Sequence, residues 1–173
     1  MAVHRLNHAV LYVRDVERTV AFYRDVFRFE QVAGFPGAAF LKAPASTNDH
    51  DLGLFEVGAA AASSQAGRGG VGLYHLAWEV ETLDDLEEHQ ERLAAAGALT
   101  GMSDHGTTKS LYGRDPDGLE FEVVWLVPAH LLEGKNLADD PRPKPLELAR
   151  EKERYGGQTR GGLGISIPLN VTV

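Results

Sequence analysis

The chain has 173 residues, of which 43% are hydrophobic and 24% are charged, and its formal net charge is −8 at pH 7. This balance is typical of a globular protein with one ordinary domain or two small fused modules, and the acidity argues against nucleic acid as the main partner. The absence of cysteine excludes disulfides, thiolate metal ligands and cysteine nucleophiles. The apolar runs are too short to cross a bilayer and the N-terminus lacks a signal-peptide pattern, so we expect a cytoplasmic protein without a membrane partner.

The first part of the chain predicts a strand, a helix and three short strands. Residues 6–13 are rich in Val, Leu and Tyr, which favours a strand. Asp15 is a plausible N-cap for a helix that ends near Phe27. The apolar residues of this helix fall on one face, at Val16, Val20, Tyr23 and Phe27. Shorter strand-like runs follow around residues 29–32, 38–42 and 52–57.

The second part of the chain repeats this order. Residues 58–71 are rich in Gly, Ala and Ser, which predicts a linker. A strand at 73–80 follows, and Thr82 with Asp85 three residues later is typical of a capping box at the start of a helix. Gly97 is a natural stop for that helix. Short strands then lead to the run LEFEVVWLV.

A fixed spacing relates the two parts. His8 and His75 lie 67 positions apart, and so do Leu52 and Leu119. We therefore predict two βαβββ modules, at about 4–57 and 72–127, each too small to bury its own sheet face. The fold class is α+β: tandem modules that form a cupped mixed β-sheet with the helices outside, in one domain spanning residues 1–127.

The segment 128–173 differs in composition from the repeat. It carries the run DDPRPKP, a possible helix at 146–155 and a glycine-rich stretch. We expect a C-terminal extension that acts as an arm on a partner subunit or as a flap over a site, and a partly ordered surface segment is the plainer alternative.

Three polar residues in apolar strands predict a metal site. His8 and His75 each lie in the first strand of a module, and Glu122 lies in the middle of LEFEVV. Two imidazoles and one carboxylate form a facial set that suits Fe(II) or a similar divalent ion. The segment Asp115 to Gly118, DPDG, is typical of a turn and is not expected to supply a ligand.

The chain resembles the vicinal oxygen chelate superfamily, most clearly in NHAVLYVRDVERTVAFYRDVF and YGRDPDGLEFEVVW. This superfamily includes glyoxalase I, fosfomycin and bleomycin resistance proteins, and the type I extradiol catechol dioxygenases. The resemblance covers about residues 4–127. It supports the predicted pair of modules and leaves the C-terminal extension without a counterpart.

Within the superfamily, the chain is most similar to the extradiol dioxygenases. The stretches HDLGLFE, YHLAWEV and DHGTTKSLYGRDPDGLEFE carry this similarity. It implies a catechol-like aromatic substrate, O2 as the second substrate, a homodimer and a divalent metal, with Fe(II) favoured over Mn(II), Zn(II) or Ni(II). It places the metal ligands at His8, His75 and Glu122, the catalytic histidine at His50 and the substrate contacts at His105 and Tyr112.

The repeat spacing conflicts with a catalytic role for His50. A spacing of 67 makes Phe55 the counterpart of Glu122, and strict alternation along a strand then turns His50 away from the cavity. A bulge or strand offset near residues 49–51 is needed to bring it back.

Two other functions remain open. One is a glyoxalase-type lyase or isomerase, or a thiol-transferring or epoxide-opening resistance enzyme, with the metal as a Lewis acid. Glyoxalase-like sites take a fourth protein ligand from the first module, where the repeat offers Phe55, and Glu56 is one residue away. The other is a non-catalytic protein that binds a small aromatic molecule, as bleomycin resistance proteins do.

Overall fold

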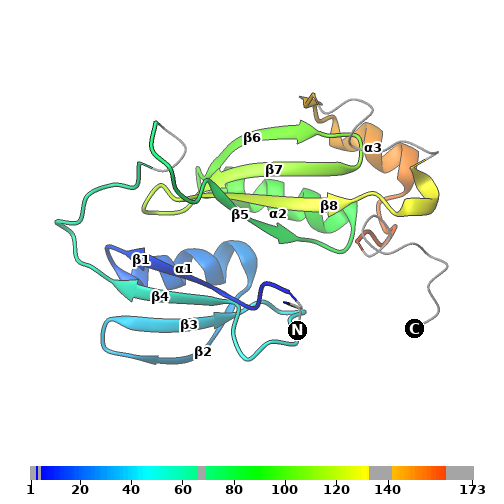
Figure 1. Ribbon diagram of the computed structural model, residues 1–173. Helices are drawn as coiled ribbons and strands as arrows, with labels where there is room; N and C mark the ends of the chain where they lie inside the picture. Colours follow the sequence, from blue (N-terminus) through cyan, green and yellow to red (C-terminus); the bar gives the residue numbers. More distant parts are fainter. Residues whose placement is uncertain (1–2, 4, 66–68, 133–141, 163–173) are drawn as a thin grey trace. The chain divides into compact units, whose positions relative to one another are not determined.

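The computed structural model describes residues 3, 5–65, 69–132 and 142–162. Contacts divide the chain into two compact units, Met1–Gln65 with Asp115–Leu119, and Ala66–Arg114 with Glu120–Val173. Each contains a mixed sheet with helices on it, so the predicted α+β class is confirmed (Figure 1). Within the described residues, no helix has the length and apolar character needed to cross a membrane.

The first unit contains a four-stranded sheet and one helix. Its strands lie in the order β1-β4-β3-β2, with β1 parallel to β4 and the other neighbours antiparallel. Side chains from one face of the sheet, among them Leu52 and Leu54, are fully buried. In chain order the elements are β1 (Ala9–Val13), α1 (Val16–Phe27), β2 (Glu30–Phe35), β3 (Ala38–Lys42) and β4 (Leu52–Glu56).

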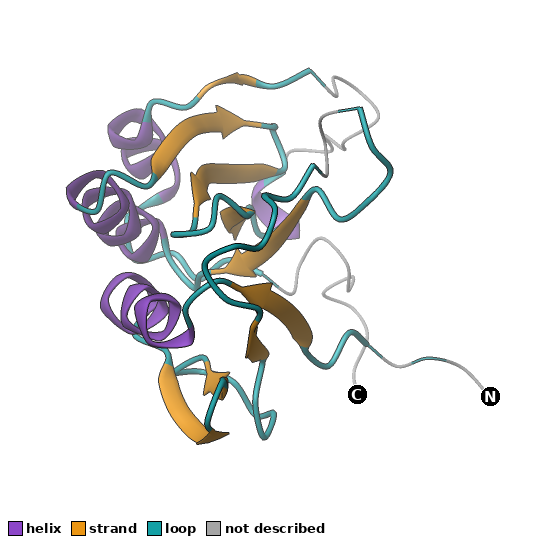
Figure 2. Ribbon diagram, turned by 90° about the vertical axis from the view of Figure 1, so that its left-hand side faces the viewer, coloured by secondary structure: helices purple, strands orange, loops and turns teal. Residues whose placement is uncertain are grey.

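Helix α1 covers one face of this sheet and begins where the sequence predicts (Figure 2). The Asp15 side chain accepts a hydrogen bond from the Arg18 amide at 2.9 Å and so caps the first turn. Val16, Val20 and Tyr23 are buried on its apolar face. The periodic apolar residues therefore position α1 against the sheet and leave the other sheet face to the site residues.

The second unit repeats this arrangement and extends it. Its five-stranded sheet has the order β5-β8-β7-β6-β9, with β5 parallel to β8 and the other neighbours antiparallel. In chain order the elements are β5 (His75–Glu79), α2 (Leu83–Ala95), β6 (Leu99–Asp104), β7 (Thr108–Arg114), β8 (Glu120–Leu126), the 3₁₀ helix η1 (Ala129–Leu131), β9 (Lys144–Pro145) and α3 (Leu148–Tyr155).

Helix α2 has the predicted capping box and stop. Thr82 Oγ1 accepts from the Asp85 amide at 3.1 Å, and the Asp85 carboxylate accepts from the Thr82 amide at 3.0 Å. Gly97 follows the helix with a φ of +65°, a conformation that glycine adopts without strain. Asp85 thus occupies the position in the capping box where Glu or Gln is usual.

Residues 142–162 of the C-terminal extension pack on the second unit. Strand β9 pairs with the edge strand β6, and Leu146 and Leu148 are buried. The Tyr155 ring lies 5.6 Å from the Trp125 ring, and Trp125 Nε1 donates to the Thr159 carbonyl at 3.2 Å. The residues from 163 onward lie outside the described part of the chain.

The strand pairing corrects the correspondence between the two units that a constant spacing of 67 residues predicts. Val10 pairs with Gly53 in the first unit, whereas Ala77 pairs with Glu122 in the second. Val10 and Ala77 are 67 positions apart, but Gly53 and Glu122 are 69 apart, so the second unit has a net gain of two positions between its first and last paired strands. The counterpart of Glu122 is therefore Gly53, and its identification as Phe55 was wrong.

Candidate functional site

The open face of the second unit carries polar side chains in the middle of the sheet. On β8, Phe121, Val123 and Trp125 are buried, whereas Glu122 between them is half-buried and points to the opposite face. Tyr112 on β7 pairs directly with Glu122 and shares its face. The strand register thus gathers ionisable groups on the side of the sheet opposite its apolar core.

His75 and Glu122 meet on this face. His75 Nε2 lies 3.1 Å from Glu122 Oε2, and the two side chains are 27% and 13% exposed. Two cis ligands of an octahedral ion, each about 2.1 Å from the metal, are about 3.0 Å apart. The pair is therefore spaced as two neighbouring ligands of one divalent ion, and both side chains remain reachable from solvent.

His75 also leaves a polar atom without a partner. Its Nδ1 is buried and has no hydrogen bond to any other described residue. The Tyr74 ring lies against the imidazole at 4.8 Å and the Tyr112 ring at 6.0 Å. The ring orientation is therefore set by aromatic packing and by Glu122.

His105 and Tyr112 form a second pair on the same unit. His105 Nε2 and the Tyr112 hydroxyl are 2.8 Å apart. Burial first, and then the charge of Glu122, raise the pKa of Tyr112 above its ordinary value. The phenol therefore keeps its proton and can donate it in a hydrogen bond.

His8 precedes β1 in the first unit and is held by its neighbour. His8 Nδ1 lies 2.8 Å from Asn7 Oδ1. Asn48 Nδ2 donates to the Asn7 carbonyl at 2.8 Å and to Asp51 Oδ1 at 2.7 Å, which ties the segment before β1 to the segment before β4. An amide oxygen at Nδ1 is the kind of acceptor that fixes a metal-binding histidine, and it leaves Nε2 as the free ligand atom.

His50 lies beside His8, contrary to the orientation that strict alternation predicts. Its ring is 4.5 Å from the His8 ring and 5.2 Å from the Phe40 ring. Strand β4 begins only at Leu52, so His50 belongs to the preceding loop and the alternation rule does not reach it. The His50 amide donates to Asp49 Oδ1 at 2.9 Å, and this hydrogen bond comes first among the causes that lower the pKa of Asp49.

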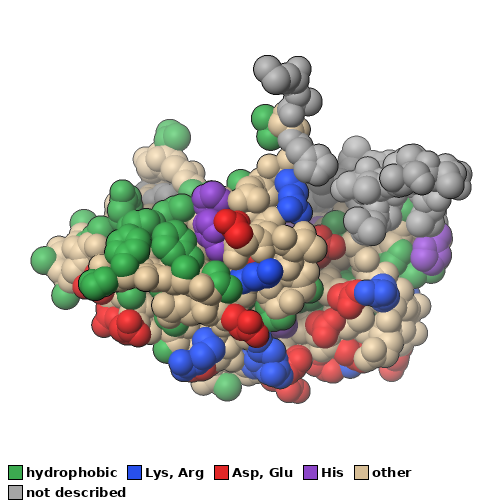
Figure 3. Space-filling model, turned by 90° about the horizontal axis from the view of Figure 1, so that it is seen from below, with side chains coloured by type: hydrophobic (Ala, Val, Ile, Leu, Met, Phe, Trp, Pro, Cys, Tyr) green, Lys and Arg blue, Asp and Glu red, His purple; other side chains and the backbone are tan. Residues whose placement is uncertain are grey.

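The open face of the first unit is mainly aromatic. The rings of Phe35, Phe40 and Phe55 are mutually 6.0 to 6.3 Å apart. Val10 and Tyr12 on β1 are 52% and 74% exposed. Hydrophobic side chains gather on one part of the surface in Figure 3, with histidine next to them. Such a surface suits a flat apolar ring.

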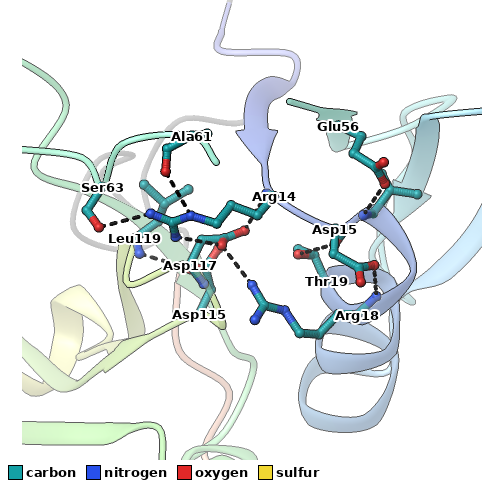
Figure 4. Close-up of polar contacts among 11 residues, drawn as sticks. Arg14, Asp15, Arg18, Thr19, Glu56, Ala61, Ser63, Asp115, Asp117 and Leu119 are labelled. Carbon is teal, nitrogen blue, oxygen red and sulfur yellow. Dashed lines mark hydrogen bonds and ion pairs between the residues drawn. The ribbon is translucent and has the colours of Figure 1, made fainter. Parts of the chain in front are cut away.

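The turn at Asp115–Gly118 has a structural role, as predicted. Asp115 Oδ1 accepts from the amides of Asp117 and Leu119, both at 2.9 Å. Asp117 binds the Arg14 guanidinium at 3.0 Å and that of Arg18 at 2.7 Å (Figure 4). The arginines thus fasten the turn to the start of α1 within the first unit. No sequence pattern identified them.

Asp115 is the most perturbed carboxyl group of this cluster. Burial raises its pKa to about 6, against the lowering effect of the backbone hydrogen bonds from Leu119 and Asp117. Its Oδ2 is buried and has no hydrogen-bond partner among the described residues. The charge of Asp115 in turn helps burial to raise the pKa of Tyr23.

The structure brings the proposed site residues together in two groups. One group is His75, Glu122, Tyr112 and His105 in the second unit, and the other is His8 and His50 in the first. Within either unit, over the described residues, no three His, Asp or Glu side chains come close enough to hold a metal ion.

Comparisons with known proteins agree with the resemblance seen in the sequence. Residues 5–123 match the family described as the Glyoxalase/Bleomycin resistance protein/Dioxygenase superfamily. The chain is 30% identical over 123 residues to biphenyl-2,3-diol 1,2-dioxygenase 2 of Rhodococcus globerulus, which covers 70% of this chain and 63% of that protein.

Two further proteins extend these comparisons. The chain is 26% identical over 127 residues to the manganese-dependent 2,3-dihydroxybiphenyl 1,2-dioxygenase of Geobacillus genomosp. 3, with 71% of this chain and 37% of that protein covered. It therefore spans less than two thirds of the length of both dioxygenases. The structure of lactoylglutathione lyase from Agrobacterium tumefaciens is also similar, with a TM-score of 0.54, 26% identity and coverage of 72% of this chain and 95% of that chain.

Proposed function

The chain belongs to the Glyoxalase/Bleomycin resistance protein/Dioxygenase superfamily, and on this premise we propose that it is a metal-dependent extradiol dioxygenase. Its substrates are a catechol-like aromatic diol and O2. The observation that carries the proposal is the 3.1 Å contact between His75 and Glu122, with the Tyr112–His105 pair on the same unit. The names of two relatives, dioxygenases of dihydroxybiphenyls, support the substrate class.

The proposed metal ligands are His8, His75 and Glu122. Two neutral imidazoles and one carboxylate leave a divalent ion with a net positive charge and open coordination positions. The ion supplies a centre that binds the two adjacent oxygens of a diol and admits O2 next to the ring. Fe(II) is the favoured metal, and Mn(II) is the first alternative, because one relative is named as manganese-dependent.

The remaining polar residues supply proton transfer and hydrogen bonds. Ring cleavage requires a base for a hydroxyl proton, an acid that returns a proton and a donor for the developing negative charge. His50 is the proposed acid–base group, with Asp49 3.3 Å from its Nδ1. The Tyr112 hydroxyl is the proposed donor, and His105 orients it through their shared 2.8 Å hydrogen bond.

The aromatic face of the first unit supports an aromatic substrate. Phe40 and Phe55 lie on the open face of the sheet, and Phe40 packs edge-on against His50. Aromatic rings prefer such edge-to-face or offset contacts, and each is worth about 1 kcal/mol beyond the burial of surface. A second ring on the substrate would add to these contacts. We also propose that the protein forms a homodimer.

A glyoxalase-type Lewis-acid enzyme is the alternative, and the similarity to lactoylglutathione lyase favours it. This reading needs a fourth protein ligand from the first module. The residue that corresponds to Glu122 is Gly53, which has no side chain, and Glu56 Oε2 already accepts a hydrogen bond from the Val16 amide at 3.1 Å. The first unit therefore offers the metal no carboxylate at that position, which supports the three-ligand reading.

The test is anaerobic reconstitution with Fe(II) or Mn(II), followed by addition of air and a panel of catechols that includes 2,3-dihydroxybiphenyl. We expect oxygen uptake equal to the diol consumed and a yellow ring-cleavage product. The Glu122→Gln variant is the control for the ligand set, and Glu153→Gln, at an exposed position on α3, is the control for substitution itself.

Two outcomes would contradict the proposal. One is metal-loaded protein that converts a hemithioacetal without taking up oxygen, which would establish the Lewis-acid alternative. The other is protein that binds the aromatic ligands tightly with no metal and no turnover, which would establish a non-catalytic binding protein.

A further inference from the structure

Lys109 on β7 is a buried lysine between two carboxylates of the second unit. It is 1% exposed, and its Nζ lies 2.5 Å from Asp104 Oδ1 and 2.9 Å from Glu151 Oε2. The Tyr155 ring lies 5.6 Å from the same nitrogen. A lysine is almost never buried this fully without paired charges, so the site is built around the ammonium group.

The Asp104 carboxylate joins this lysine to the loop that carries His105. Asp104 Oδ1 also accepts a hydrogen bond from the Gly106 amide at 2.7 Å. Burial acts to raise the pKa of Asp104, but the hydrogen bonds from Lys109 and Gly106 outweigh it and leave the pKa below its ordinary value. One oxygen atom therefore holds both the lysine and the amide that follows His105.

The C-terminal extension encloses Lys109 from the other side. Glu151 on α3 is 6% exposed, and its Oε2 makes no hydrogen bond to a described residue, so the ion pair with Lys109 compensates its charge. Strand β9 pairs Lys144 with Asp104 and Pro145 with Ser103. The extension thus adds both a counter-ion and a neighbouring strand to the segment that leads into His105.

We propose that Lys109 is a positioning residue for His105, and that α3 makes this possible by burying the lysine against Glu151. Lys109 keeps Asp104 ionised and directed at Gly106, and the closed turn aims His105 Nε2 at the Tyr112 hydroxyl. The function of His105 in catalysis rests on the proposed activity. The positioning itself is a property of the fold and can be measured without turnover.

The experiment compares three variants by amide hydrogen exchange at Gly106 and by the imidazole nitrogen signals of His105 in NMR spectra. Lys109→Met removes the cation and leaves two carboxylates uncompensated. Lys109→Met combined with Glu151→Gln removes the buried charge on α3 as well. Lys152→Met is the matched control, because Lys152 lies on the same helix as Glu151 but forms its ion pairs with Asp84 and Glu87 on α2.

In Lys109→Met we expect the Gly106 amide hydrogen to exchange about tenfold faster, because the Asp104 carboxylate loses its charge-assisted hydrogen bond from Lys109. The imidazole nitrogen signals of His105 should also shift. The double variant should regain thermal stability, since a neutral buried pair is tolerated, but its Gly106 exchange should stay fast. Lys152→Met should leave both signals as in the wild type. If Lys109→Met does not fold, Gly106 exchange and the His105 signals of the double variant test the proposal.

The proposal is overturned if the double variant restores Gly106 protection together with stability, because Lys109 would then act only through packing. It is equally overturned if Gly106 and His105 are unchanged in a folded Lys109→Met protein. Failure of the dioxygenase assay leaves these readouts unaffected. If the enzyme is active, the folded Lys109 variants should lose kcat with little change in KM, and Lys152→Met should keep the wild-type kcat.

Discussion

Replacement of Asp115 by asparagine should change how stability depends on pH. The buried carboxyl group has its pKa raised to about 6 from an ordinary 3.8. A pKa higher in the folded state means that the group's contribution to stability is fully present below about pH 3.8 and is lost as the pH rises through about 6. In neutral solution the folded protein therefore carries a buried carboxylate at a cost of about 3 kcal/mol.

The Asp115→Asn variant does not lose stability by this ionisation as the pH rises, and it keeps the geometry of the turn. Its amide oxygen can accept from the amides of Asp117 and Leu119, as Asp115 Oδ1 does at 2.9 Å. Between about pH 5 and about pH 8, the free energy of unfolding of the wild type should fall by about 1.5 kcal/mol relative to Asp115→Asn. Because the two proteins share their other titratable groups, the change with pH in the difference between their unfolding free energies reports on Asp115.

Urea denaturation followed by tryptophan fluorescence at several pH values measures this difference. The part of the difference in unfolding free energy that does not change with pH is not diagnostic. It also contains the effect of replacing the unpartnered Asp115 Oδ2 by an amide NH2 group. The slope is diagnostic. The reasoning is refuted if the two proteins keep the same difference in unfolding free energy at both ends of the pH range.

Four further substitutions test the site and the fold. Glu122→Gln should weaken Mn(II) binding about a hundredfold, measured by calorimetry, and unchanged affinity would remove Glu122 from the ligand set. Tyr112→Phe should lower kcat about tenfold to a hundredfold in the oxygen-uptake assay with KM nearly constant, whereas a rise in KM alone would assign the hydroxyl to binding. Phe55→Ala should raise KM for a two-ring diol more than for catechol, and equal effects would place the ring elsewhere. Thr82→Ala should lower the free energy of unfolding by about 1 kcal/mol and leave kcat as it is, so a loss of kcat would show that α2 influences the site.

Local signals predicted the helices well because each depends on neighbours in sequence. The Asp15 cap, the Thr82–Asp85 box and the glycine stop at Gly97 all occur as expected. These features need only a few consecutive residues, and the apolar periodicity then selects the face that packs on the sheet.

Strand register was harder to predict because it depends on pairing across the sheet. The runs LGLFEV and LEFEVV align without a gap, yet pairing places Gly53 opposite Val10 and Glu122 opposite Ala77. A shift of two positions keeps the same side chains on the open face, so apolar alternation gives no warning of it. The side to which His50 turns was likewise hidden, since its loop is shaped by Asp51 and Asn48.

Long-range polar networks were invisible in the sequence. The Lys109–Glu151 contact joins residues on β7 and α3, and the Arg14–Asp117 contact joins residues 103 positions apart. Neither has a spacing rule, and a lysine inside a strand is usually exposed. Only the folded chain shows that the extension contributes to the surroundings of His105.

The most direct test of the three-ligand site counts the histidine nitrogens bound to the metal. Mn(II)-loaded protein is prepared with ordinary and with ¹⁵N-labelled histidine, and nitrogen couplings are read by pulsed electron paramagnetic resonance. Two bound imidazoles are expected in the wild type, and one in each of His8→Ala and His75→Ala. A wild-type signal with one histidine nitrogen or none, at full Mn(II) occupancy, would contradict the site on which the proposed function depends.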